Sequence, residues 1–142
     1  MEIRHADEED YPGIAGLIKN ELGYENLKNE EIIERLRDIG KCDKFLTLAA
    51  RLGGGVVGFI GLNRAVTYEV MGELMWILAF AVSEKCQHQG IGTKLLEAAE
   101  DYAKECDIKQ LKLTSAFRRT DAHKFYESRG FEAKSYAFFK YL

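Results

Sequence analysis

The sequence predicts an α/β protein with a mixed, mostly antiparallel central sheet that is flanked by helices on both faces. Segments with apolar residues at helical spacing follow one another along the chain with segments at strand spacing. A glycine-rich tetrapeptide at residues 52–55 separates two apolar segments and indicates a β-hairpin. The unbroken apolar run at residues 74–82 is typical of a strand that is covered on both faces and lies at the centre of a sheet.

Two helices are expected before the main sheet. Asp7 is placed to cap the first helix, because its carboxylate can accept hydrogen bonds from the first free amides, and Gly23 ends that helix. Asn29 is placed to cap the second helix, which Gly40 closes. The apolar residues at helical spacing are Tyr11, Ile14, Leu17 and Ile18 in the first helix, and Ile32, Leu36 and Ile39 in the second.

Strands are expected at residues 45–51 and 56–62, on either side of the glycine turn, and residues 63–72 form a loop or a strand extension. After the apolar run, a helix begins at Ile91, and its inner face is marked by Ile91, Leu95, Ala99, Tyr102 and Cys106. A short strand around residues 111–113, a helix over 122–129 and an aromatic strand over 136–142 complete the chain.

Composition limits the class of function. The chain has 142 residues, 46% of them hydrophobic and 30% charged, which suits one soluble domain over residues 1–142. A net charge of −3 argues against a nucleic-acid surface, and the apolar run is too short to span a membrane. The N-terminus lacks the pattern of a secretory signal, so a cytoplasmic protein is expected. The three cysteines, at 42, 86 and 106, indicate neither a disulfide framework nor a zinc site.

The most informative stretch is Gln87-His88-Gln89-Gly90-Ile91-Gly92, which joins the apolar run to a helix. Glycines at such a turn let backbone amides approach a phosphate, and the free amides and dipole of the helix N-terminus attract the anion. The order of residues fits neither a dinucleotide-binding fingerprint nor a P-loop. A ligand that carries phosphates is therefore expected.

The order Gln-x-x-Gly-x-Gly resembles the acyl-CoA signature of the GNAT family of N-acetyltransferases. A second stretch, residues 119–131, is similar to a late helix of that family, with Ala122, Phe125, Tyr126, Gly130 and Phe131 in matching order. The strand at residues 3–6, followed by acidic residues, also looks like a GNAT opening, so the resemblance covers most of the chain. It implies the same mixed sheet, acetyl-CoA as cosubstrate and no metal.

The resemblance also implies where the cosubstrate binds. The pantetheine arm would bond to main-chain groups near Phe80 and Val82, while the pyrophosphate would rest on amides from Gln87 to Thr93. Arg119 stands where many relatives have an asparagine that bonds pantetheine, and Arg118 or Arg119 could reach a CoA phosphate. The expected cofactor-binding residues are Phe80, Val82, Gln87, His88, Gln89, Gly90, Ile91, Gly92, Thr93, Lys94 and Arg119.

For catalysis, the resemblance places Tyr126 as the general acid that protonates the departing thiolate; the alternative is a purely structural aromatic. Many relatives carry a basic glutamate on the central strand, but residues 74–82 contain no ionisable side chain. Glu73 precedes this run and is better explained as a strand-end residue, so ordered water is the preferred base. His88 is a weaker candidate, because it lies in the phosphate loop.

A primary amine of a small molecule or a peptide is the expected acceptor. Its groove is expected between residues 22–25 and 63–73, which flank the acyl end of the cofactor in the family. Two further possibilities remain open. The chain could be a non-catalytic acyl-CoA-binding or regulatory domain, and its aromatic C-terminal strand could form a homodimer.

Overall fold

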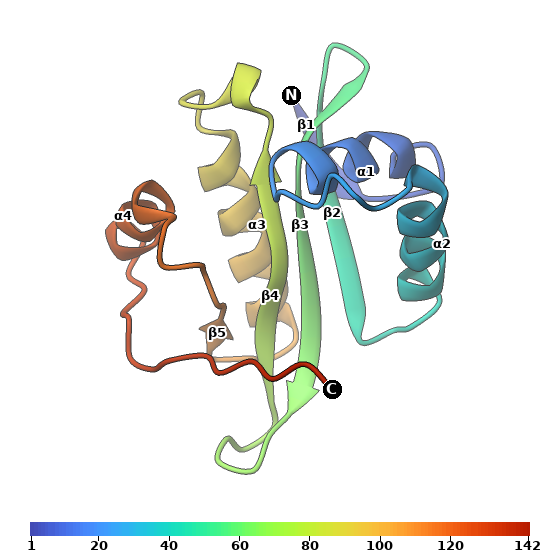
Figure 1. Cartoon of the computed structure of the whole chain (residues 1–142). Coiled ribbons are helices and arrows are strands. Elements are labelled where there is room, and N and C mark those ends of the chain that lie inside the picture. The colour runs from blue at the N-terminus through green and yellow to red at the C-terminus, as the bar shows by residue number, and fades with distance from the viewer. The chain divides into compact units, whose positions relative to one another are not determined.

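Five β-strands form one sheet in the order β1-β2-β3-β4-β5 (Figure 1). The computed structural model describes every residue of the chain, 1–142. The strands are β1 (Glu2–His5), β2 (Phe45–Leu52), β3 (Gly55–Val66), β4 (Glu73–Val82) and β5 (Leu111–Lys112). All neighbours pair antiparallel except β4 and β5, which run parallel. The predicted mixed, mostly antiparallel sheet is confirmed.

The chain divides into two compact units, Met1–Lys112 and Leu113–Leu142. The first unit holds the sheet, the helices α1 (Tyr11–Asn20), α2 (Asn29–Gly40) and α3 (Ile91–Glu105), and a 3-10 turn, η1 (Glu84–Cys86). The second unit holds α4 (Thr120–Ser128). A single functional domain over residues 1–142 stays a prediction. None of the helices combines the length and the apolar character that crossing a bilayer requires.

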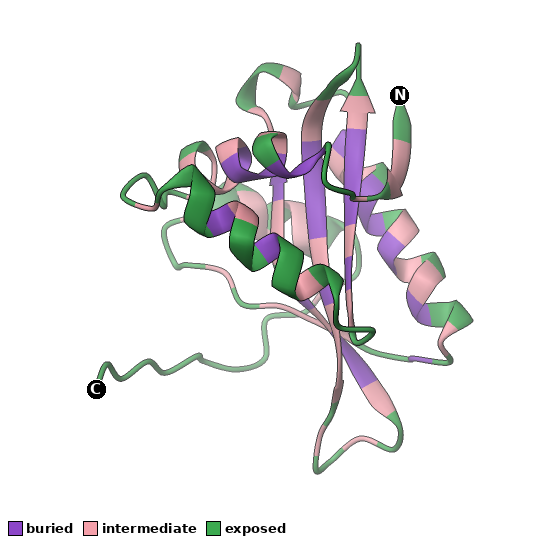
Figure 2. Cartoon of the chain, turned by 90° about the vertical axis from the view of Figure 1, so that its right-hand side faces the viewer, coloured by how far each residue is buried: buried purple, intermediate pink, exposed green.

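Helices cover both faces of the sheet, as the sequence predicts. On one face, α1 and α2 bury apolar side chains such as Ile14 and Leu36 against Phe59 and Ala81 of the sheet. On the other face, α3 approaches the sheet at Gly58, where an added Cβ would lie 3.1 Å from a Leu95 methyl carbon. Figure 2 shows the buried positions running along the strands and the inner sides of these helices.

The apolar run forms β4 as predicted, but β4 is not the central strand. With five strands in the order observed, β3 is in the middle and β4 is second from the edge. A strand sequence without alternation indicates that both faces of the strand are covered, and here the helix layers cover them. It does not indicate where in the sheet the strand lies. The expected hairpin is present, since Leu52 pairs with Gly55, and β3 continues to Val66.

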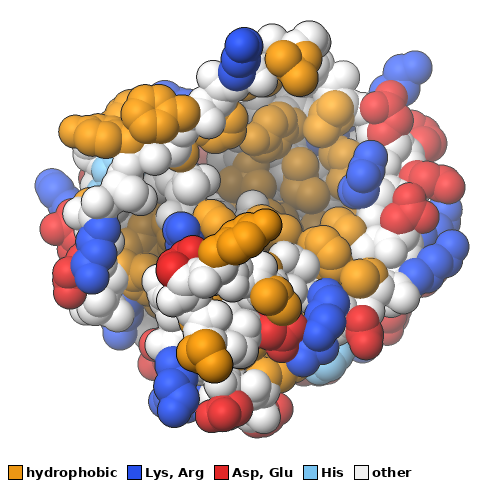
Figure 3. Space-filling view, turned by 90° about the horizontal axis from the view of Figure 1, so that it is seen from below, with side chains coloured by type: hydrophobic (Ala, Val, Ile, Leu, Met, Phe, Trp, Pro, Cys, Tyr) orange, Lys and Arg blue, Asp and Glu red, His pale blue; other side chains and the backbone are white.

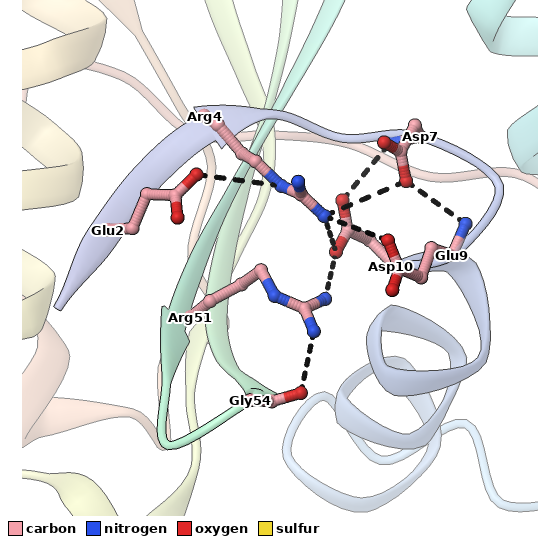
Figure 4. A network of polar contacts seen from close by, with 7 residues as sticks. All are labelled: Glu2, Arg4, Asp7, Glu9, Asp10, Arg51 and Gly54. Carbon is pink, nitrogen blue, oxygen red and sulfur yellow. Dashed lines mark hydrogen bonds and ion pairs between the residues drawn. The ribbon is translucent and has the colours of Figure 1, made fainter.

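Helix α1 begins at Tyr11, so Asp7 does not cap it directly. Asp10 occupies the cap position, but its carboxylate accepts hydrogen bonds from Arg4, Arg51 and the Asp7 amide instead (Figure 4). Asp10 is completely buried. Burial raises the pKa of this carboxyl, but the hydrogen bonds from Asp7, Arg4 and Arg51 outweigh it and leave the pKa below its usual value.

The expected C-terminal strand is absent. Residues 131–142 belong to no helix or strand, and the large side chains from Tyr136 onward are exposed. Aromatic side chains favour strands only where a neighbouring strand and a packed face stabilise them, because β-propensity mainly measures such packing. No strand pairing in the sheet involves a residue beyond Lys112. The prediction of a strand at residues 136–142 is therefore wrong for the single chain.

Candidate active site

Strand β4 continues well beyond its pairing with β5. Met75 and Trp76 pair with Leu111 and Lys112, while β4 itself extends to Val82. Ile77 and residues 79–82 thus pair with β3 on one side, and no strand pairing of the sheet involves them on the other side. Backbone N–H and C=O groups require hydrogen-bond partners. This edge of β4 can therefore accept an extended ligand that carries amide groups of its own.

A β-bulge reshapes β4 where this open edge begins. Ile77 pairs with Leu62 and Ala79 pairs with Gly61, so Leu78 has no residue opposite it on β3. The side chain of Leu78 is exposed, at 57%, in the midst of a buried strand. A bulge reverses the alternation of the residues that follow it. No pattern in the sequence had indicated this bulge.

Beyond the bulge, Phe80 and Val82 lie opposite Ile60 and Gly58 of β3. Paired residues of neighbouring strands point to the same face of a sheet. Since Gly58 faces α3, the side chains of Phe80 and Val82 lie on the α3 face, where both are half-buried. Their side chains therefore contribute to the packing between the sheet and α3.

The loop after β4 presents a row of backbone donors. The amides of residues 88–93 make no hydrogen bond to another backbone group, and they include the N-terminal amides of α3. Gly90, the N-cap of α3, has φ +80°, and His88 has φ +65°. A side chain at Gly90 would be strained in this conformation, whereas glycine adopts it readily. Together with the positive end of the helix dipole, these donors can hold an anion.

Two side chains fix the loop that carries these donors. Gln87 donates from its amide nitrogen to the Val82 carbonyl oxygen at 3.3 Å, which folds the loop back on the end of β4. Glu21, just after α1, accepts a hydrogen bond at 3.1 Å from the backbone amide of Glu84. In addition, Gly58 of β3 pairs with Val82. Gly58 lies close to the first turn of α3, because a Cβ added to it would be 3.3 Å from the Cγ2 atom of Ile91. The loop is therefore held in place at the end of β4.

Of the ten residues of β4, only Glu73 carries an ionisable side chain, and this side chain is already engaged. Its Oε2 lies 2.8 Å from Lys44 Nζ and its Oε1 lies 3.7 Å from Arg64 Nη1. The hydrogen bond from Lys44 is the main reason why the pKa of Glu73 lies below its usual value. Glu73 opens the strand, whereas the loop with the free amides follows Val82, roughly 30 Å along β4 at about 3.3 Å per residue.

In the second unit, Tyr126 lies in α4 and Arg119 occupies the cap position before that helix. The Tyr126 ring is half-buried and packs edge-on against Phe125 and Phe131, with ring centroids 5.7 and 5.6 Å away. Burial raises the pKa of Tyr126, and the charge of Arg119 lowers it to a smaller extent. The hydroxyl therefore keeps its proton at neutral pH.

His123, in the same helix, is tied to the segment before α4. Its Nε2 lies 2.9 Å from the Ala116 carbonyl oxygen and 3.2 Å from the Ser115 hydroxyl, so it connects α4 to the chain that enters it. These contacts indicate a structural role for His123 within the second unit.

The segments expected to border the acceptor expose apolar side chains. Tyr24 follows α1 and is 54% exposed, and Val66, Tyr68 and Met71 are exposed at the connection between β3 and β4. Figure 3 looks at the molecule from the end that carries this connection and shows hydrophobic side chains at the surface. No group of three or more His, Cys, Asp or Glu side chains is placed to hold a metal ion, and the cysteines are all free.

Comparison with known proteins identifies relatives over nearly the whole chain. Residues 2–131 match the family described as Acetyltransferase (GNAT) family. The chain is 31% identical to aminoalkylphosphonate N-acetyltransferase of Salmonella typhimurium, over 99% of this chain and 91% of the relative. It is 30% identical to the uncharacterized N-acetyltransferase YhdJ of Bacillus subtilis, over 93% of this chain and 89% of the relative.

The fold also matches solved structures. One is an aminoglycoside N-acetyltransferase, AAC(6′)-Iy, in complex with CoA. It has a TM-score of 0.87 and covers 99% of this chain and 93% of its own, at 15% sequence identity. At that identity the comparison establishes the shared fold.

Proposed function

Because the chain belongs to the GNAT family of acetyltransferases, we propose that it transfers an acetyl group from acetyl-CoA to a primary amine, directly and within a ternary complex. The observation that carries this proposal is the row of unused amides at residues 88–93, next to the open edge of β4. An extended ligand that combines amide groups with a pyrophosphate is complementary to both features. CoA is such a ligand.

The cosubstrate would bind along β4 and across the loop. The pantetheine amides would pair with main-chain groups near Phe80 and Val82, and the pyrophosphate would accept hydrogen bonds from the amides of residues 88–93. Lys94 and Arg119 would add positive charge for the phosphates. Gln87 would act indirectly, because its hydrogen bond to the Val82 carbonyl oxygen shapes the loop.

The reaction requires two proton movements. The amine nitrogen attacks the thioester carbon, the carbon–sulfur bond breaks, and the departing thiolate receives a proton from Tyr126. Tyr126 meets the first requirement of this role, because a tyrosine hydroxyl is protonated at neutral pH. The tyrosinate then regains a proton from solvent.

The amine must lose a proton before or during its attack, and we assign this proton to ordered water that leads to bulk solvent. The ion pair of Glu73 with Lys44 supports this assignment, because it stabilises the carboxylate and lowers its affinity for a proton. A base with a depressed pKa is poorly matched to an alkyl ammonium group. His88 would instead face the pyrophosphate from its place in the loop.

The acceptor that we favour is a small-molecule amine, although a peptide amine fits the same chemistry. Two relatives support a small molecule: one is named for aminoalkylphosphonates and the other for aminoglycosides. These acceptors differ in charge, so the comparison favours an amine class without selecting one compound. Residues 22–25 and 63–73 would border the acceptor.

A second candidate function is acyl-CoA binding without catalysis. The specific observation in its favour is that β4 carries no ionisable side chain after Glu73. The loop and the open edge would serve a regulatory domain equally well. Tyr126 counts against it, since a binding domain has no need of a general acid.

The test is a screen of primary amines with acetyl-CoA, read out by release of the CoA thiol and by the mass of the acetylated product. We expect one class of amines to release CoA well above the rate without amine. If CoA raises the melting temperature but no amine is acetylated, the binding function replaces the catalytic one. If CoA does not stabilise the protein at all, both functions are rejected.

A further inference from the structure

The end of α1 is tied to the segment that enters the loop at residues 87–93. Oε1 of Glu21, the C-cap residue of α1, accepts a hydrogen bond at 3.1 Å from the backbone amide of Glu84. The two residues are 63 positions apart in the sequence, and both belong to the unit Met1–Lys112. A hydrogen bond from an amide to a carboxylate is charge-assisted and stronger than one between neutral groups.

The backbone of Glu21 is itself held in place. Its amide donates to the Leu17 carbonyl oxygen at 2.9 Å, and the amide of Leu22 donates to the same oxygen at 3.3 Å. Leu17 belongs to the buried core of the first unit, and Leu22 packs against that core. The Glu21 side chain therefore extends from a fixed point at the end of α1.

Glu84 occupies the point from which the loop departs. It opens η1, and Gln87 follows η1 directly. The residue before Glu84, Ser83, is bound to β3, because its amide lies 2.8 Å from the Val57 carbonyl oxygen. The position of η1 therefore determines where the row of amides at residues 88–93 begins.

The row of amides needs an anchor at this end. At its other end, the Lys94 amide donates to the Gly90 carbonyl oxygen at 3.0 Å, so that α3 holds the loop there. Donors that must first be ordered bind an anion less tightly than donors already in place, because the ordering costs free energy. A contact that fixes η1 therefore increases the affinity of residues 88–93 for an anion.

A direct contact between Glu21 and the phosphates of a ligand is unfavourable, since carboxylate and phosphate are both negative. We propose instead that Glu21 is a positioning residue for the cosubstrate. Its hydrogen bond to Glu84 holds η1 where residues 88–93 present their amides to the pyrophosphate of CoA. This inference rests on the proposed function, because it gives Glu21 a part in binding CoA. Glu21 acts through the loop and takes no part in the proton movements of the reaction.

The first test measures the affinity for CoA of the parent and three variants by calorimetric titration. Glu21→Ala removes the hydrogen-bond acceptor and should weaken CoA binding by about three- to ten-fold, the factor that corresponds to the net strength of one hydrogen bond. Glu21→Gln keeps an acceptor oxygen without the charge and should bind CoA at least as tightly as the parent. The matched control Glu30→Ala removes a negative charge at an exposed position of α2 and should leave the affinity unchanged.

The outcomes separate this inference from the proposed function. If the parent does not bind CoA, both are rejected. If the parent binds CoA and Glu21→Ala binds it equally well or more tightly, only the role of Glu21 is rejected. A loss in Glu21→Gln as large as that in Glu21→Ala also rejects this role, because the acceptor oxygen would then be irrelevant.

The second test needs no ligand and follows hydrogen exchange of single amides by NMR. In Glu21→Ala the Glu84 amide should exchange at least about three-fold faster, because its hydrogen bond is lost. The Met75 amide, which donates to the Gln110 carbonyl oxygen at 2.9 Å, reports the stability of the whole unit and should keep its protection. Unchanged exchange at Glu84, or equal acceleration at both amides, overturns the inference.

Discussion

Oε2 of Glu73 lies 2.8 Å from Nζ of Lys44, so the only carboxylate of β4 is held in an ion pair at the start of that strand. The two residues are 29 positions apart in the sequence. The family resemblance implies a glutamate on this strand as the general base. In this chain the one candidate on the strand, Glu73, is ion-paired with Lys44. This relationship directs the first prediction.

Glu73→Gln should change kcat by less than about three-fold, because the carboxylate is ion-paired and water carries the proton of the amine. The rising limb of kcat/KM with pH should follow the pKa of the amine supplied, and it should move when a less basic amine is used. Rate profiles with several amines measure this directly. A limb that stays fixed across amines and disappears in Glu73→Gln would identify Glu73 as the base.

Tyr126→Phe should lower kcat by about ten- to a thousand-fold, within or somewhat below the usual contribution of a positioned acid. The affinity for CoA should stay nearly the same, because phenylalanine keeps the ring contacts with Phe125 and Phe131. Steady-state kinetics and calorimetric titration with CoA separate the two effects. Equal losses of kcat and of CoA affinity would instead indicate a structural role for Tyr126.

We expect CoA to raise the melting temperature of the parent protein, and Gly90→Glu should abolish this rise, because it places a negative charge and a side chain at the proposed phosphate site. Gly72→Glu is a matched control: Gly72 also has a positive φ, +78° against +80°, and it lies in the connection before β4 rather than after it. The control should lose similar intrinsic stability but keep the CoA response. Equal stabilisation of both variants by CoA would rule out the proposed phosphate site.

Asp10→Asn should lower the free energy of unfolding at pH 7 by about 2–4 kcal/mol, because it weakens the charged hydrogen bonds of a fully buried carboxylate with Arg4 and Arg51. The pKa of Asp10 is lowered in the folded state. Its stabilising contribution is therefore present above the ordinary pKa of about 3.9 and is lost as the pH falls through the lower folded value.

Urea unfolding of the parent and of Asp10→Asn at several pH values tests this dependence. The difference between the two proteins should be greatest near neutral pH and should shrink as the pH falls below about 3.9. A difference that stays constant from pH 7 down to acid would show that the charge of Asp10 does not stabilise the fold.

Local sequence patterns predicted most of the elements correctly. Helical spacing located α1, α2 and α3 to within a few residues, since one buried face per helix suffices to define each pattern. The glycine turn predicted the hairpin, and Gly90 marked the start of α3, because positive φ values favour glycine. These features depend on neighbours in the sequence, and so the sequence alone contains them.

The composition of the candidate site was predictable only in part. The loop at residues 87–93 follows from its motif, and its unused amides follow from the start of a helix. The general-acid role proposed for Tyr126 came from the resemblance to a family. The engagement of Glu73 could not be predicted, because it depends on Lys44 and Arg64 from other strands and loops.

By itself, the sequence determined the kinds of most elements, their order, the glycine turn and the glycine-containing loop before α3. Only the tertiary structure decided the bulge at Leu78, the early end of pairing between β4 and β5, and the place of β4 next to the edge strand. It also decided that Asp10 meets Arg51, 41 residues away, and that the aromatic tail forms no strand in the single chain. The physical reason is that strand register, ion pairs and strand formation depend on partners distant in the sequence, whereas turns and helix faces are set by residues close together.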